Sequence, residues 1–200
     1  MAIEKANILT FVNTALQENY SNTDLDDQIQ MVLDELSKRD MLVGTATPSL
    51  VNGDTTIDYP TGYRAMIALT LTLTTSGSAQ FPLLPLKGGH EEYRQLLHND
   101  NTTGITRWFS KFNSKFWLWR PINQAATVLI EYIKDHPQDV DTIEFDETKY
   151  KNVIYSGACY YTALTRKKKS YLEIWTPKWL YDLGQAELEV VHPARFVEGN

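Results

Sequence analysis

Four histidines and one cysteine are the residues of this chain best suited to hold a metal or act as a nucleophile. None of the histidines stands three or four residues from another histidine, or from a carboxylate arranged for a metal, as a helical site requires; they are His90, His98, His136 and His192. Cys159 lies within an apolar helical stripe, so we expect a buried, unreactive thiol. The sequence has no Gly-x-Ser-x-Gly elbow, and "KGGHEE" lacks the spacing of a phosphate-binding loop. We therefore predict no catalytic residue, no metal site and no cofactor, in a protein that is not an enzyme.

An acidic run follows the middle of the chain and could imitate a calcium loop. Its members are Asp135, Asp139, Asp141, Glu144, Asp146 and Glu147. The run lacks the Asp-x-Asp-x-Asp-Gly order and the glycine turn that such a loop needs. A solvated loop is the simpler interpretation, and a negatively charged interface or a surface facing a channel is the alternative.

Two further groups have the composition of contact surfaces. The first is a tryptophan cluster, Trp108, Trp117 and Trp119, in which the last two share one face of a strand because they lie two residues apart. This cluster could stack sugars or bases, or it could pack in a core or against another subunit. The second is "RKKK", Arg166, Lys167, Lys168 and Lys169, at the end of a helix. These cations could simply favour the negative end of the helix dipole, or they could contact an acidic neighbour or DNA phosphate.

Composition indicates a folded protein that does not bind DNA tightly. The chain has 200 residues, of which 42% are hydrophobic and 22% charged, and a formal net charge of −6. Phosphate binding normally requires a basic surplus, which this chain lacks. A single cysteine rules out a disulfide within the chain. We find no secretory signal and no membrane-spanning stretch, so we expect the protein to be made in the cytoplasm of its host cell.

Apolar spacing predicts helices at both ends of the chain. Two helices are expected in residues 1–40, with Thr23 and Asp26 forming a capping box between them. A third helix should begin at Asp146, and its small residues Gly157 and Ala158 should let another helix approach closely. A final helix is expected over about 177–190, with Pro177 in its first turn. Its inner face is predicted to hold Trp179, Leu180, Leu183 and Ala186.

The middle of the chain, residues 41–134, alternates with period two and predicts one small antiparallel sheet interrupted by a helix at about 90–98. "NGD" after Val51 indicates a hairpin turn. "RWFSKF" and "KFWLWRP" form a second hairpin, and "ATVLIEYIK" is the strand that follows. The fold class is therefore α+β: a bundle of N- and C-terminal helices with an inserted antiparallel sheet. We expect a single domain, residues 1–200, with a helical body at 1–40 and 146–190, the β-rich insertion, and an extended tail at 191–200.

Several of these segments resemble one family. From about residue 85 to 190 the chain resembles the head-to-tail connector, or adaptor, proteins of tailed bacteriophages, and its element order is similar to that of tail tubular gatekeeper proteins. The resemblance lies in "HEEYRQLL", "TGITRWFSKFNSKFWLWRP", "TVLIEYIKDHP", "IEFDETKYKNVIYSGACYYTAL" and "YLEIWTPKWLYDL".

The resemblance implies a structural virion protein in the neck or tail of a phage particle. Twelve copies would form a ring beneath the portal, extend the DNA channel and provide a platform for tail or nozzle proteins. DNA would pass through the channel without tight binding, and no membrane would be involved. We expect contacts with the portal or an adjacent subunit through residues 166–169 and through the tail "HPARFVEGN", which supplies His192, Arg195 and Phe196. Phe196 would anchor the tail, and Arg195 would pair with a carboxylate.

Two other functions remain open from the sequence. A carbohydrate-binding tail or surface module would use the tryptophan face, and added glycans would then shift the tryptophan fluorescence. A lysin-like hydrolase would need two carboxylates that converge in a cleft, and we can identify no such pair from the sequence.

Overall fold

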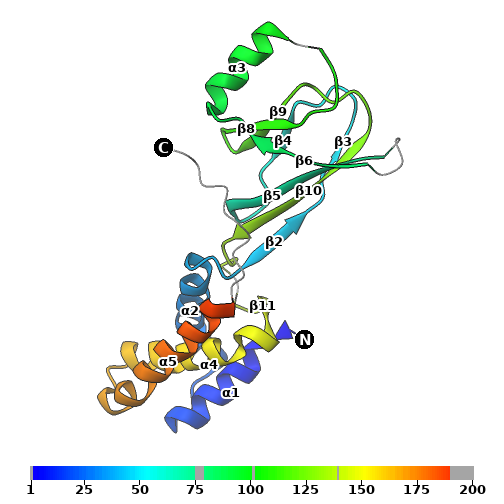
Figure 1. The fold of residues 1–200 in the computed structure, drawn as a ribbon. Helices are drawn as coiled ribbons and strands as arrows, with labels where there is room; N and C mark the ends of the chain where they lie inside the picture. The colour runs from blue at the N-terminus through cyan, green and yellow to red at the C-terminus, as the bar shows by residue number, and fades with distance from the viewer. Residues whose placement is uncertain (1, 75–78, 101, 139, 190–200) are drawn as a thin grey trace. The chain divides into compact units, whose positions relative to one another are not determined.

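The computed structural model describes residues 2–74, 79–100, 102–138 and 140–189. These residues divide into two compact units (Figure 1). A helical unit is formed by the segment that ends at Leu42 together with the segment that begins at Lys134, and a β-rich unit comprises Val43–Ile133. The secondary structure is α+β with mostly antiparallel strands, so the predicted fold class is confirmed.

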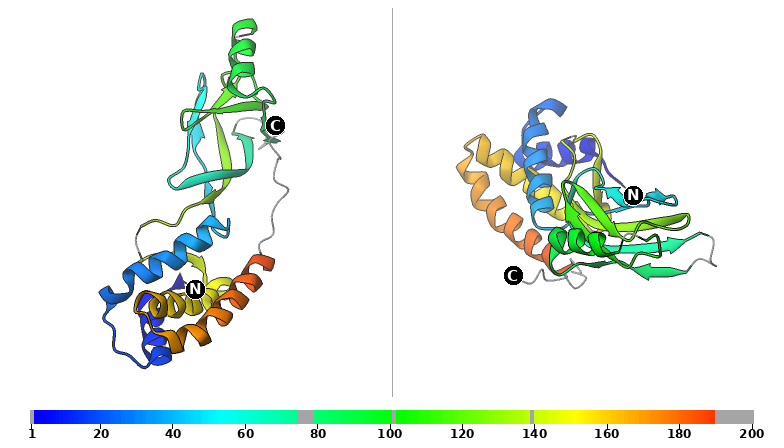
Figure 2. Two further views of the ribbon diagram at one scale, coloured as in Figure 1. Left: turned by 90° about the vertical axis from the view of Figure 1, so that its left-hand side faces the viewer. Right: turned by 90° about the horizontal axis from the view of Figure 1, so that it is seen from above.

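The helical unit brings the two ends of the sequence together around one core. Its elements are β1 (Ala2–Ile3), α1 (Lys5–Leu16), the 3-10 helix η1 (Asn22–Leu25), α2 (Asp26–Lys38), β11 (Ile143–Asp146), α4 (Glu147–Thr165) and α5 (Lys169–Glu189). Helix α4 packs against α1, α2 and α5, as Figure 2 also shows. The short strands β1 and β11 pair antiparallel. Ile8, Leu33 and Ile154, from three different helices, are fully buried in this core. The predicted helical bundle is therefore confirmed.

Gly157 on α4 lies in close contact with side chains of two neighbouring helices. A Cβ atom built at Gly157 would lie 2.6 Å from Cζ3 of Trp179 on α5 and 2.9 Å from Cγ2 of Val32 on α2. Only the absence of a side chain at this position allows Trp179 to lie against the backbone of α4. The prediction that a small residue here admits a neighbouring helix is confirmed.

Helix ends agree with the predictions in one case and differ in two. Asp146 caps α4, because its Oδ1 accepts a hydrogen bond of 2.8 Å from the Thr148 amide. The capping box before α2, however, is formed by Ser21 and Asp24, so the predicted pair of Thr23 and Asp26 is wrong. Helix α5 begins at Lys169, so Pro177 lies inside it and not in its first turn.

The inner face of α5 is close to the predicted one. Trp179, Leu183 and Ala186 are buried, but Leu180 points outward and is 59% exposed. The prediction for Leu180 was wrong because successive helical residues are rotated by about 100°, which turns Leu180 away from the side of the helix that Trp179 shares with Leu183 and Ala186.

The β-rich unit contains two sheets and one helix. Its elements are β2 (Val43–Ala46), β3 (Ser49–Leu50), β4 (Thr56–Asp58), β5 (Tyr63–Leu73), β6 (Gln80–Pro82), β7 (Leu84–Pro85), α3 (Gly89–Asn99), β8 (Trp108–Phe112), β9 (Lys115–Trp119) and β10 (Ala126–Lys134). One sheet has the order β2-β10-β5-β6, with β3 also on β10, and the other has the order β4-β9-β8-β7. All pairs with a described register are antiparallel except β7 with β8. The two sheets share a core that includes Leu71, Phe109, Phe116 and Val128.

Strand pairing corrects two predictions. The turn at "NGD" exists, and Gly53 there has φ +95°, but it does not close a hairpin: β3 pairs with β10, whereas β4 pairs with β9. The hairpin of β8 and β9 is present, with Asn113 and Ser114 at positive φ in its two-residue turn. It lies in a different sheet from β10, so these three strands are not the centre of one sheet.

Candidate interaction surfaces

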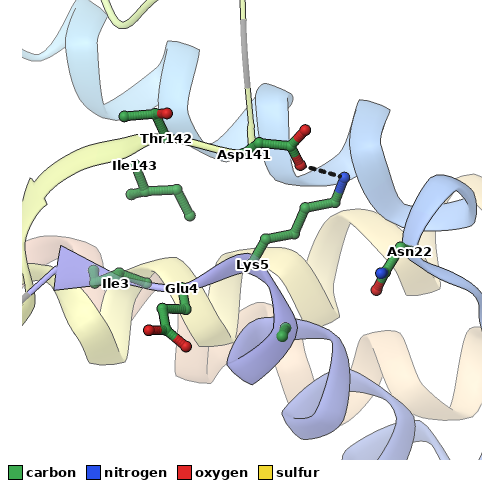
Figure 3. A pocket seen from close by; sticks show the side chains of 8 residues that line it. Ile3, Glu4, Lys5, Asn22, Asp141, Thr142 and Ile143 are labelled. Carbon is green, nitrogen blue, oxygen red and sulfur yellow. Dashed lines mark hydrogen bonds and ion pairs between the residues drawn. The ribbon is translucent and has the colours of Figure 1, made fainter.

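One pocket of about 400 Å³ opens on the helical unit (Figure 3). It is lined by Ile3, Glu4, Lys5, Ala6, Asn22, Asp141, Thr142 and Ile143. Lys5 Nζ pairs with Asp26 at 2.6 Å and with Asp141 at 3.0 Å, and the hydrogen bond to Asp26 raises the pKa of Lys5 above its ordinary value. A lysine held charged between two carboxylates is a structural ion pair and a poor general base.

Cys159 and His136 are also held in structural roles. Cys159 is buried, and desolvation raises the pKa of its thiol to about 12, as expected for an unreactive cysteine. His136 is buried against Phe145, and its Nε2 accepts a hydrogen bond of 3.2 Å from the Glu144 amide. Within the described ranges, no group of three or more His, Cys, Asp or Glu side chains could hold a metal. None of the described helices is long and apolar enough to cross a bilayer.

Four members of the acidic run face different partners. Asp141 pairs with Lys5, Glu144 with Lys134, and Glu147 with Lys151 at 3.0 Å, while Asp146 caps α4. The hydrogen bonds from Thr148 hold the pKa of Asp146 below its ordinary value. Asp139 lies outside the described residues. The arrangement is that of ion pairs and a helix cap, and it does not resemble a calcium loop.

The tryptophan cluster lies on one face of the sheet formed by β4, β9, β8 and β7. Trp108 on β8 pairs directly with Trp119 on β9, and Trp117 lies two residues before Trp119 on the same face. Phe109, Phe116 and Leu118 point to the opposite face and are buried in the core. The hydrophobic core of the unit is therefore packed against the face opposite the tryptophans. On the tryptophan face, Trp108 remains 38% exposed.

Helix α3 covers part of this tryptophan face. His90 on α3 stacks on Phe112 with ring centroids 4.1 Å apart, and Tyr93 lies 5.7 Å from Trp117. The Trp117 Nε1 donates to the Phe112 carbonyl at 3.0 Å. Trp108 and Trp119 form the part of the face for which no contact with α3 is described, and the Arg120 guanidinium lies 5.1 Å from the Trp119 ring centroid. The sequence did not indicate that α3 returns to cover Trp117.

The basic segment forms the turn between α4 and α5. Lys167 has φ +55°, and the Lys168 amide donates to the Ala163 carbonyl at 2.9 Å, which closes the end of α4. Arg166 lies 3.9 Å from Asp24, and Lys168 pairs with Glu18. Lys167 and Lys169 are exposed and pair with no acidic residue in the described part of the chain. The remaining predicted contact residues, His192, Arg195 and Phe196, lie outside the described residues.

An exposed apolar surface that we did not predict lies on α5. Ile174, Leu180, Tyr181 and Leu188 are all exposed. The signal was present in the sequence, because residues 174, 181 and 188 are seven apart. The predicted start at residue 177 left Ile174 outside the helix, so only two members of this repeat fell within it.

Comparison with known families identifies the family of this chain. Residues 5–191 match the family model described as SU10 adaptor protein. A comparison with curated proteins found no match. Because the family match spans nearly the whole chain, this protein belongs to the SU10 adaptor protein family and is a phage adaptor, a structural component of the virion.

Proposed function

We propose that this adaptor assembles as a ring of twelve copies beneath the portal, where it extends the DNA channel and provides the platform for tail or nozzle proteins. The observation that supports this best is the adaptor family match across residues 5–191. A non-enzymatic role is consistent with the family match and with the ion pairs and helix cap that hold Lys5, Asp141, Glu144, Asp146 and Glu147. The protein is made in the cytoplasm of the bacterial host and acts in the particle.

Charge supports passage of DNA without tight binding. The chain has a net charge of −6, and acidic and basic residues nearly balance within Val43–Ile133, so the acidic excess lies in the remaining segments. Affinity for DNA comes largely from phosphate neutralisation, which an acidic surface does not supply. In an electrophoretic mobility-shift assay, the protein should therefore not slow the migration of duplex DNA even at low salt. A clear shift of the DNA band would contradict a channel that lets DNA pass without binding it tightly.

Contacts with the portal or an adjacent copy are assigned to two segments. The first is residues 192–200, with Phe196 as an apolar anchor and Arg195 as a partner for a carboxylate. The second is the basic turn, residues 166–169. In this turn, Lys167 and Lys169 form no ion pair with an acidic residue in the described part of the chain. Because surface ion pairs are screened, this second contact should weaken as salt is raised. The tryptophan face, Trp108, Trp117 and Trp119, is proposed as a further contact between subunits.

The test is imaging of the purified portal after addition of the protein. The full chain should add a ring of density under the portal, and absence of that density would overturn the proposed function. A chain that ends at residue 191 should remain folded by circular dichroism but fail to add the ring. Normal assembly by this truncated chain would overturn the role of the tail alone, because the ring itself would still be present.

A further inference from the structure

Helix α3 belongs to a layer of the β-rich unit that is separate from the hydrophobic core. It packs against β8 and β9 (Figure 1), and its rings contact Phe112 and Trp117 on the tryptophan face. None of its residues belongs to the buried core cluster of this unit. The core residues Phe109 and Phe116 lie on the opposite face of the sheet. Helix α3 can therefore leave the tryptophan face without exposing the core.

Few contacts hold α3 on this face. Tyr93 is 3% exposed and is the only buried residue of the helix. The rings that touch the sheet, His90 and Tyr93, both lie in its first two turns, and the His90 Nδ1 lies 3.1 Å from the Ser110 Oγ. Isolated helices of about this length are marginal in water, so α3 depends on this docking. Elements with few buried contacts open locally while the rest of a domain stays folded.

An ion pair, which we call the latch, fastens the C-terminal end of α3. Asp100 directly follows the helix and pairs with Arg120, which directly follows β9. Both side chains are partly exposed, at 31% and 39%, and exposed ion pairs hold weakly. In the closed arrangement the Arg120 Nε and the Trp119 Nε1 are buried and find no acceptor in the described chain, which costs free energy. Opening the latch would let water reach both donors.

A short hinge precedes α3 at its other end. The chain is fixed as far as Leu86, which is buried and whose amide donates to the Phe109 carbonyl at 2.8 Å. Lys87 and Gly88 are exposed. Gly89 has φ +61°, and a Cβ atom there would meet nothing within 4 Å, so this glycine serves the backbone conformation and not a close contact. Hinges of lids and loops are a few residues of this kind that absorb a change in backbone angles.

We propose that α3 is a strap that covers the tryptophan face in the free subunit and opens about Gly89 when copies assemble. This inference rests on the proposed ring, in which the tryptophan face contacts the next copy. Trp117 cannot make that contact while the rings of His90 and Tyr93 lie 5.4 and 5.7 Å from it. Opening would join Trp117 to Trp108, which is already exposed, in one aromatic surface. Buried aromatic anchors of this kind dominate binding at interfaces, and a closed strap keeps them covered until then.

A covalent latch tests whether the strap must open. In the double variant Asp100→Cys and Arg120→Cys, a short bis-maleimide reagent links the two new thiols and keeps α3 closed, whereas without the reagent the latch is missing. Cys159 is buried and does not compete for the reagent. Ring occupancy beneath the portal should be at least tenfold lower for the internally linked chain than for the native chain. The unlinked variant should occupy the ring at least as fully as the native chain.

Asp58 and Lys115 supply the matched control. They form an exposed ion pair at 3.0 Å between β4 and β9, two strands that are paired whether α3 is closed or open. Asp58→Cys combined with Lys115→Cys, linked by the same reagent, should leave ring occupancy unchanged. An equal loss in this control would show that linkage itself prevents assembly, and would overturn the inference.

Hydrogen exchange gives a second measurement that needs no cross-link. In the native free subunit, the amides of α3 should exchange with deuterium at least tenfold faster than those of β8 and β9. Asp100→Asn keeps the size of the side chain and removes the charge of the latch. It should speed exchange in α3 further and leave β8 and β9 unchanged. Equal protection of α3 and the two strands, or no effect of Asp100→Asn, would overturn the strap.

The outcomes separate this inference from the proposed function. A full ring formed by the internally linked chain would overturn the inference and leave the proposed function intact. Loss of the ring in the unlinked variant alone would show that assembly needs α3 closed, and would also overturn the inference. Absence of a ring with the native chain would overturn the proposed function as well.

Discussion

At the scale of single residues, Gly157 sets how closely α4 and α5 pack. We predict that Gly157→Ala destabilises the helical unit. The new methyl group would lie 2.6 Å from the Trp179 ring, which is 4% exposed and stacks on Tyr160, so the ring has little room to move. Overpacking of this kind costs about 1–3 kcal/mol, and the better helix propensity of alanine offsets about 1 kcal/mol of that. Thermal unfolding followed by circular dichroism should show a midpoint lower by a few degrees.

Gly184→Ala on α5 is the matched control for this prediction. It makes the same chemical change inside a helix, but a Cβ atom there meets nothing within 4 Å. The free energy of unfolding should rise slightly or stay unchanged. Equal destabilisation by both substitutions would show that the contact between Gly157 and Trp179 does not determine the packing.

Some of these residue roles could be predicted from sequence and others could not. Gly157 and Cys159 stand within a regular apolar stripe, so their burial follows from helical period alone. His136 gave no such signal, because its burial depends on the Glu144 amide and Phe145, which come from the following strand. Likewise, Arg166 and Lys168 look like free cations in the sequence, whereas they pair with Asp24 and Glu18 near the other end of the chain.

At the scale of elements, α3 is held on the tryptophan face by few contacts. Tyr93 is its only buried residue, and His90 stacks between Tyr93 and Phe112 at 5.2 and 4.1 Å. The His90 Nδ1 lies 3.1 Å from the Ser110 Oγ. Burial of the ring, with a smaller effect of Arg94, lowers the pKa of His90 below its ordinary value. The docked helix therefore favours the neutral imidazole.

We predict that α3 loosens as the pH falls. When folding lowers the pKa of a base, the associated stability is complete above the ordinary pKa, near 6.5, and decreases as pH drops toward the lowered value. Backbone amides of α3 should exchange with deuterium faster at acidic pH than at neutral pH, after correction for intrinsic rates. His90→Phe keeps an aromatic ring and removes the titration, so its protection should not depend on pH. The same pH dependence in both proteins would rule out His90 as the cause.

The start of α5 and the partners of the strands could not be predicted from the sequence, because both depend on tertiary contacts. Thr176 and Pro177 look like the start of a helix, but α5 begins at Lys169, and Trp175 in the added segment lies 5.9 Å from the Phe11 ring, a tertiary contact that the local sequence does not indicate. Strand positions followed from alternation, whereas strand partners did not, because pairing depends on distant segments. The split of β3 and β4 between two sheets, across the "NGD" turn, is the clearest example.

At the scale of the whole molecule, the β-rich unit is an insertion whose ends meet. Each unit has its own hydrophobic core. At the junction, the Lys134 amide donates to the Leu42 carbonyl at 3.0 Å. This is the hydrogen bond that joins the first and fourth residues of a two-residue hairpin turn. The helical unit is therefore built from chain segments that a very short connection can join.

We predict that the helical unit folds without the insertion. In a variant in which Asn-Gly replaces residues 43–133, Leu42 and Lys134 would occupy the outer positions of a turn that their hydrogen bond already matches. The core of α1, α2, α4 and α5 loses none of its members, since all of them lie outside the replaced segment. The variant should give a helical circular dichroism spectrum and a single cooperative thermal transition. A second variant with a longer Gly/Ser linker serves as the control, because it removes any strain in the turn. If both variants lack a cooperative transition, the helical core depends on the β-rich unit, and the two units are not independent folding units.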